Sequence, residues 1–188
     1  KTDWCYRTEP DESMNNISIR YPRGKTLGGS SSINGLLYIR GQNRDYDIWR
    51  QLGNTGWGWD DVLPYFIKSE NQERGKSEYH GVNGPLSVSD TRIKLDLLEK
   101  FMDAAEEKGI PRVNDFNQGD NFGCGYFQVT EKNGLRCSAA VGYLNPVKKR
   151  KNLKIETNCH VQKINFDGTK AISVTFWKNN QLNTIKAN

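Results

Sequence analysis

The sequence predicts an α+β fold, with several helices and a three-stranded antiparallel sheet near the C-terminus. Three observations predict it. Apolar and polar side chains alternate over residues 152–179, and the Asp-Gly pair at 167–168 is typical of a tight hairpin. Apolar side chains over residues 93–108 recur at the three- and four-residue spacing of a helix face. The glycine- and serine-rich stretch PRGKTLGGSSSINGLLYIRG, at residues 22–41, precedes a helix-compatible apolar run.

The N-terminal part is predicted to be extended first and helical afterwards. Residues 1–27 are expected to form extended segments joined by the turn-rich crossing EPDESMNN. A helix is predicted to begin at Ser30, although Gly35 lowers the helix propensity of this stretch. Its apolar residues include helical spacings: Ile33, Leu36, Leu37 and Ile39.

Two shorter helices are predicted next. The first lies within residues 43–53, with Asn43 as its cap and Gly53 as its stop. The second lies within residues 59–71 and has acidic residues near its start, where they favour the helix dipole. Pro64 fits this second helix only if it lies in the first turn, because proline has no backbone N–H to donate.

The longest helix is predicted over residues 93–108, after a short strand at residues 86–88. Gly109 would end this helix. Its apolar stripe is expected to be buried as core and not to bind a cofactor. The stripe consists of Leu97, Leu98, Phe101, Met102 and Ala105.

The C-terminal part is predicted to contain one more helix and the sheet. A strand around residues 126–129 interrupts a long loop, and a helix over residues 138–149 is expected to stop near Asn145 because Pro146 follows. Three antiparallel strands are then predicted from the alternation. Their apolar positions are Leu153 and Ile155, then Val161, Ile164 and Phe166, and then Ile172, Val174 and Phe176.

Composition sets limits on the function. The 188 residues carry a net charge of +5. The basic cluster KKRK at residues 148–151 is most simply explained as a solvated helix end. The four cysteines have no paired spacing, so neither a zinc site nor a disulfide framework is indicated, and a cytoplasmic location is expected. No apolar run is long enough to span a bilayer. His80 is expected to be a loop residue fixed by a turn, and His160 to be a strand residue.

The glycine-serine junction is a candidate anion site. A glycine-rich approach to a helix N-terminus lets a ligand come close to unpaired backbone N–H groups, and phosphate is the natural ligand. The stretch lacks the GK[ST] ending of a phosphate-binding P-loop and the GxGxxG pattern of a dinucleotide fingerprint. A purely structural helix cap would have a similar sequence, so this pattern alone leaves both readings open.

The sequence of this stretch resembles the first signature of the glucose-methanol-choline (GMC) oxidoreductases, flavoenzymes that oxidise alcohols with FAD. The segment that carries the similarity is RGKTLGGSSSINGLLYIRGQNRDYDIW. The segments DWCYRTEP, LGNTGWGWDDVLPYFIKSE, YHGVNGPLSVSD and GLRCSAAVGYLNPVKKRKNLKIETNCHVQKINFDG extend the likeness over nearly the whole chain. The choline dehydrogenase-like and alcohol dehydrogenase-like branch is the most similar.

The resemblance implies a set of cofactor-binding residues. Thr26, Leu27, Gly29 and Ser30 would line the diphosphate and ribityl part of FAD. Asn34, Gly35, Leu36 and Leu37 would pass along the isoalloxazine, and the main chain of Val161 would meet the adenine. Some family members bind FAD covalently through a histidine in this signature. No histidine lies near Ser32 here, so noncovalent FAD is expected.

The resemblance also implies that the chain is an internal fragment of a two-domain FAD enzyme. The GxGxxG unit would precede it, and the catalytic histidine region would follow it, so no catalytic residue is assigned within it. Residues 1–52 and 131–188 would belong to the FAD-binding domain, and residues 53–130 to the substrate side. The chain alone is expected to be inactive, whether it binds FAD alone is left open, and exposed apolar faces are expected to favour self-association.

The implied partners are a small-molecule alcohol, such as choline or another primary alcohol, and an electron acceptor. The full-length protein could be membrane-associated without a transmembrane segment. One alternative is a stand-alone phosphate- or nucleotide-binding module without redox activity. A second alternative, a nucleic-acid binder, is disfavoured because the tryptophans show no basic-aromatic repeat.

Overall fold

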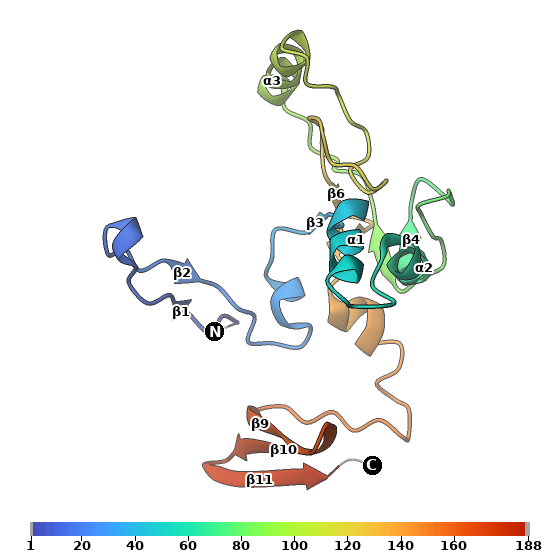
Figure 1. Cartoon of the computed structure of the whole chain (residues 1–188). Helices are drawn as coiled ribbons and strands as arrows, with labels where there is room; N and C mark the ends of the chain where they lie inside the picture. Colours follow the sequence, from blue (N-terminus) through green and yellow to red (C-terminus); the bar gives the residue numbers. More distant parts are fainter. Residues whose placement is uncertain (1, 187–188) are drawn as a thin grey trace. The chain divides into compact units, whose positions relative to one another are not determined.

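Figure 1 shows the computed structural model of the chain, which describes residues 2–186. The chain forms two compact units, the first extending through Pro146 and the second beginning at Val147. The first unit contains helices and short paired strands, and the second is a three-stranded antiparallel sheet. The predicted α+β fold class is confirmed. Among the described residues, no helix is long and apolar enough to cross a membrane.

The first unit begins with an extended hairpin. Strands β1 (Tyr6–Arg7) and β2 (Arg20–Tyr21) pair antiparallel, and the 3₁₀ turn η1 (Glu12–Met14) lies between them. Asp11 caps η1 through a hydrogen bond from the Ser13 N–H, with the two atoms 2.8 Å apart. The prediction of extended segments joined by a turn-rich crossing is confirmed.

The predicted helix from Ser30 is wrong. The chain forms only a four-residue 3₁₀ turn, η2 (Gly29–Ser32), and then the short strand β3 (Leu37–Tyr38). Two physical reasons account for the difference. Serine hydroxyls of η2 donate to nearby backbone carbonyls in place of helix hydrogen bonds, and Leu36 adopts a left-handed φ of +68° that stops helical propagation.

Helices α1 (Asn43–Gln51) and α2 (Trp59–Ser69) confirm the two predicted helices and pack against each other (Figure 1). The predicted cap at Asn43 is wrong, because Gln42 caps α1 and Asn43 is its first helical residue. Aromatic rings fill the contact, with the Tyr46 ring centroid 5.8 Å from both Trp59 and Phe66. The Trp59 N–H also donates to Asp47 Oδ1 at 3.1 Å, which ties the start of α2 to α1. Pro64 lies inside α2, beyond its first turn, so the expected restriction on its position is wrong.

The end of α2 leads into a pair of parallel strands. Strand β4 (Glu70–Gln72) pairs with β5 (Leu86–Val88), which confirms the strand predicted at residues 86–88. Val88 is almost fully buried. The connection between the two strands contains Tyr79, whose carbonyl accepts a hydrogen bond from Arg40, and His80, whose ring contacts Glu70 of β4.

Helix α3 (Asp96–Glu107) confirms the longest predicted helix, with Gly109 following in a left-handed conformation. The expected burial of its apolar stripe is wrong. Only Met102 is buried, whereas Leu97 and Phe101 are 78% and 66% exposed and Leu98 is 43% exposed. The amphipathic pattern therefore predicted the helix correctly, but the described chain supplies too little apolar surface to cover it.

The first unit ends in three very short strands and a helical turn. Strand β6 (Gln128–Val129) pairs antiparallel with β3, and β7 (Glu131–Lys132) pairs antiparallel with β8 (Leu135–Arg136). A π-helical segment, η3 (Ala140–Leu144), replaces the longer helix that was predicted over residues 138–149. The expected stop before Pro146 is confirmed.

The second unit is an antiparallel meander in the order β11-β10-β9, as Figure 1 shows. Its strands are β9 (His160–Asp167), β10 (Lys170–Lys178) and β11 (Gln181–Lys186). The number of strands and the 167–168 hairpin are confirmed, but one strand was misplaced. Leu153 and Ile155 lie in no strand, and the third strand is β11. The turn before β11 has positive φ at Asn179 and Asn180, which is typical of a type I′ hairpin.

Candidate functional site

The glycine-serine segment, defined here as residues 26–37, is held as a tight turn without a long helix behind it. Gly28 and Gly29 both have positive φ, +88° and +56°, which L side chains rarely adopt. The Gly29 N–H donates to the Thr26 carbonyl at 2.9 Å. The turn therefore depends on two successive left-handed residues, and glycine meets this requirement without steric strain.

The serines of η2 mainly stabilise the turn itself. The Ser31 hydroxyl donates to the Gly28 carbonyl, and the Ser32 hydroxyl donates to the Leu27 carbonyl at 2.8 Å. Ser30 Oγ accepts a hydrogen bond from the Gly24 N–H at 3.2 Å. The original reason for expecting an anion here, the positive end of a long helix, is therefore not available in this structure.

The backbone of the segment is nevertheless open to a ligand at two glycines. At Gly29 and at Gly35, no heavy atom lies within 4 Å of the position that a Cβ would occupy. Gly28 is different, because an added Cβ would overlap the Ser32 hydroxyl oxygen. Gly28 is thus required by the packing of the turn, whereas Gly29 and Gly35 leave space beside the main chain.

Arg136 of β8 holds the far end of the segment. Its Nη1 donates to the Ser31 carbonyl at 3.0 Å and to Asn34 Oδ1 at 2.7 Å, and its Nη2 donates to the Asn34 carbonyl at 2.8 Å. The Ala139 N–H, three residues later, donates to Ser31 Oγ at 2.8 Å. The connection from β8 to η3 therefore contacts the segment at two points.

Leu36 is strained and is also held from outside the segment. Its φ of +68° is unusual for a bulky side chain. The Thr130 N–H and the Thr130 hydroxyl both donate to the Leu36 carbonyl, at 2.8 and 3.2 Å, and the Leu36 N–H donates to Asn34 Oδ1 at 3.2 Å. These contacts fix the backbone where β3 begins.

The structure brings most of the predicted site residues together in this segment. Leu27 and Leu37 are 51% and 55% exposed, and Asn34 is exposed although its side-chain oxygen accepts local hydrogen bonds. Val161 belongs to β9 in the second unit and is 56% exposed. The predicted roles of these residues toward a cofactor stay predictions.

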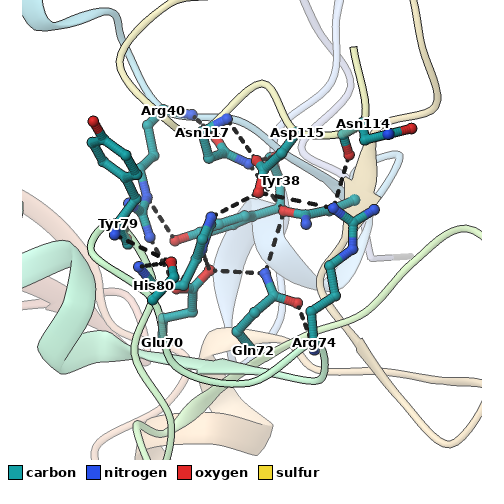
Figure 2. A network of polar contacts seen from close by, with 12 residues as sticks. Tyr38, Arg40, Glu70, Gln72, Arg74, Tyr79, His80, Asn114, Asp115 and Asn117 are labelled. Carbon is teal, nitrogen blue, oxygen red and sulfur yellow. Dashed lines mark hydrogen bonds and ion pairs between the residues drawn. The ribbon is translucent and has the colours of Figure 1, made fainter.

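A buried polar network lies behind β3, and Figure 2 shows its side chains. Glu70, fully buried at the start of β4, accepts hydrogen bonds from Arg40 Nη2 at 3.0 Å and from the Gly81 N–H at 3.1 Å. His80 Nδ1 lies 2.9 Å from Glu70 Oε2, and His80 Nε2 lies 2.8 Å from Asp115 Oδ2. Both ring nitrogens thus face carboxylates, so both must donate and the imidazole must be protonated.

Electrostatics agree with this geometry. Burial alone would lower the pKa of His80, but the hydrogen bonds to Asp115 and Glu70 and their negative charges raise it to about 9. Burial also opposes ionisation of Asp115, yet the hydrogen bonds from His80 and the Asn117 N–H bring the pKa of Asp115 below its ordinary value. The network therefore consists of buried charges of opposite sign, each paired.

The network also fixes β3 in place. Asn117 Oδ1 accepts from the Arg40 N–H at 2.8 Å, and Asn117 Nδ2 donates to the Tyr38 carbonyl at 3.2 Å. Arg40 Nε donates to the Tyr38 hydroxyl at 3.2 Å, and Arg40 Nη1 donates to the Tyr79 carbonyl at 2.7 Å. The charged side chains thus support the strand that ends the glycine-serine segment.

Sequence reasoning missed these supporting residues. His80 does contact a turn, through its N–H to Ser77 Oγ at 3.1 Å, but its buried bridge between two carboxylates was not foreseen. The signal for Arg40 was a single cation at the end of the apolar run LLYIR. Arg136 stands in GLRC with no local signal, because its partners lie more than 100 residues earlier.

Comparisons with known proteins match this chain to one family. A family model described as GMC oxidoreductase covers residues 11–188. The alcohol dehydrogenase [acceptor] of Pseudomonas putida is 42% identical over 187 residues, which are 99% of this chain and 34% of that protein. The oxygen-dependent choline dehydrogenase of Sinorhizobium fredii is 39% identical over 186 residues, again 99% of this chain and 34% of that protein.

A solved structure has the same fold over almost the whole chain. An FAD-dependent oxidoreductase from Chaetomium thermophilum superposes with a TM-score of 0.89 at 29% identity, covering 99% of this chain and 35% of the other. The chain spans about a third of the length of the curated relatives it matches. The glycine-serine segment and the network behind it fall inside the matched residues.

Proposed function

This chain belongs to the GMC oxidoreductase family, and from that premise we propose that it is part of an FAD-dependent enzyme that oxidises the CH–OH group of an alcohol. We propose choline or another primary alcohol as the substrate class, supported by the similarity to an alcohol dehydrogenase [acceptor] and to an oxygen-dependent choline dehydrogenase. The observation that carries the proposal is the open space beside the main chain at Gly29 and Gly35, two glycines of one segment whose carbonyls are held by Thr130 and Arg136. A small anionic or planar group can approach the main chain at these two positions.

The residues present fit FAD. A diphosphate needs close contact with backbone, and Gly29 offers this because no atom fills the space where its Cβ would be. A flat ring system needs apolar surface beside it, which the exposed side chains of Leu27 and Leu37 can supply. Thr26, Leu27, Gly29 and Ser30 would contact the diphosphate and ribityl part. Asn34, Gly35, Leu36 and Leu37 would contact the ring, and the main chain of Val161 would contact the adenine.

The role of these residues is to bind and orient. Bound FAD supplies a hydride acceptor for alcohol oxidation. The strained conformation at Leu36 and the hydrogen bond from Arg136 to the Asn34 carbonyl fix the direction of the main chain from Asn34 to Leu37, which would orient this segment toward the ring of bound FAD. We assign no proton transfer to this chain.

We further propose that FAD is held noncovalently. The positions around the 3₁₀ turn η2 are occupied by Ser32, Ile33 and Asn34, and none of these carries a nitrogen nucleophile that forms a stable bond to a flavin. Precipitation of the whole protein with acid should therefore release the yellow colour into the supernatant. Colour retained in the pellet would contradict noncovalent binding.

The remaining assignments concern the whole protein. We propose that residues 1–52 and 131–188 belong to its FAD-binding domain and residues 53–130 to its substrate side. An alcohol and a separate electron acceptor would be its partners, nucleic acid would not, and its location would be cytoplasmic or at a membrane surface. We expect the present chain alone to be inactive.

The first experiment is to sequence the DNA on both sides of this reading frame and to express the whole protein. We expect an upstream strand followed by GxGxxG and an acidic residue, a downstream histidine with a histidine or asparagine partner, and flavin absorption bands that bleach on addition of an alcohol. A whole protein without these sequences that binds ADP but no FAD would contradict the proposal and favour a phosphate-binding module without redox activity.

A further inference from the structure

Arg136 of β8 contacts the far end of the glycine-serine segment. Its three hydrogen bonds reach two main-chain carbonyls, those of Ser31 and Asn34, and the Asn34 side-chain oxygen. The Ser31 carbonyl lies in the last part of η2, where a helical turn leaves its carbonyls without partners inside the turn, and Asn34 lies two residues beyond η2. The guanidinium thus takes the place of the next helical turn.

We propose that Arg136 is the positioning residue of the cofactor segment, which holds the main chain at Gly29 and Gly35 in the open conformation that admits the ligand. This inference rests on the proposed function, since it takes the ligand to be FAD. It concerns the shape of the segment, and the positive charge of Arg136 is not itself required to face the ligand.

The hydrogen-bond geometry favours a positioning role over direct binding of a phosphate. Both terminal nitrogens of Arg136 already donate to the segment, and the side chain is partly buried beneath it. A planar fork can donate to two carbonyls at once in a fixed direction, whereas a lysine ammonium is a single flexible point of charge. Replacement by lysine therefore separates the geometry of Arg136 from its charge.

A second contact beside Arg136 supports the same role. The Ala139 N–H donates to Ser31 Oγ, and this hydroxyl in turn donates to the Gly28 carbonyl. The connection from β8 to η3 therefore reaches Gly28, the first left-handed glycine of the turn, through two consecutive hydrogen bonds beside the Arg136 contact. Gly29 follows Gly28 directly, so loss of the Arg136 contacts should also change the main-chain conformation at Gly29.

The test compares Arg136→Lys and Arg136→Met with Arg112→Lys as the matched control. Arg112 also makes several contacts, with the carboxylates of Glu99, Asp103 and Glu106, but these lie on α3. Amide hydrogen exchange in this chain is measured over residues 28–37. We expect both Arg136 variants to exchange at least about 10-fold faster there, and the Arg112 variant to match the original chain. Exchange in α1 and α2 serves as the internal standard, because general unfolding would raise it as well.

The same variants in the whole protein give the second readout. FAD affinity, measured by the quenching of flavin fluorescence, should fall by about 10-fold or more for both Arg136→Lys and Arg136→Met. The visible circular dichroism of bound flavin should also change, because it reports the surroundings of the ring. A lysine variant with the original exchange rates and affinity would overturn the proposal, since charge alone would then suffice.

The outcomes separate this inference from the proposed function. A whole protein that binds no FAD in its original form contradicts the proposed function, and the inference falls with it. A protein that binds FAD while neither Arg136 variant alters exchange over residues 28–37 supports the proposed function and overturns the inference. Faster exchange in both variants together with weaker FAD binding supports both.

Discussion

Raising the pH from 6 to 10 should destabilise the first unit, because His80 loses its proton in that interval. The His80 ring lies between Glu70 and Asp115 and donates to both carboxylates, while Arg40 pairs with Glu70 and Arg74 lies beside Asp115. A neutral imidazole could donate to only one of the carboxylates. The other would then be buried beside an acceptor nitrogen, which is unfavourable.

The size of the effect follows from the pKa of His80. Its folded value of about 9 lies above the ordinary 6.5, so the stabilisation is fully present below pH 6.5 and is lost as the pH rises through 9. At about 1.4 kcal/mol for each pH unit, the difference corresponds to a loss of about 3 kcal/mol from the free energy of unfolding.

The assay is urea unfolding followed by tryptophan fluorescence at several pH values, under reducing conditions. Trp177→Phe removes the tryptophan of the second unit, so that the signal reports the first. His80→Gln should lower stability by about 3–5 kcal/mol at pH 6 and remove the loss between pH 6 and 10. His160→Gln, the control at the start of β9, should retain the loss of stability between pH 6 and 10. Equal pH dependence in the original chain and in His80→Gln would refute the argument.

Three further predictions concern stability and association. Gly28→Ala should lower the free energy of unfolding in urea by about 2 kcal/mol or more, because the left-handed backbone strain combines with overlap between the new Cβ and the Ser32 hydroxyl. Gly29→Ala should cost only the left-handed strain of about 1–2 kcal/mol, and equal costs for the two variants would contradict the difference in local space. Pro64→Ala should stabilise the chain by about 1–3 kcal/mol, since α2 regains a hydrogen bond, and a lower melting temperature would contradict this. Leu97→Lys with Phe101→Lys should reduce self-association in sedimentation experiments, because both side chains are exposed on α3; an unchanged sedimentation profile would exclude this face.

Local patterns predicted most of the elements whose causes are local. The helices at α1, α2 and α3 and the hairpin between β9 and β10 have their caps, apolar spacing or turn residues within a few positions. The third strand was misplaced because the alternation at Leu153 resembles a strand. The asparagine pair at 179–180, which allows a two-residue turn, was the better signal.

Features that depend on distant partners could not be predicted in this way. The stretch after Ser30 has helical spacing, but its conformation is decided by Thr130 and Arg136, which bind its carbonyls from about a hundred residues away. The burial of α3 failed for a related reason, since periodicity predicts a face but not what covers it. The position of the candidate site was predictable from glycines and serines, whereas its supports were not.

The sequence distance between Arg136 and the segment it clamps has a consequence for synthesis. Arg136 is separated from Ser31 by 105 residues. At roughly 5–20 residues per second, a ribosome needs roughly 5–20 s to make the connecting chain. Arg136 is not yet synthesised during that time, so the final shape of the glycine-serine turn is set only after most of the first unit has been translated.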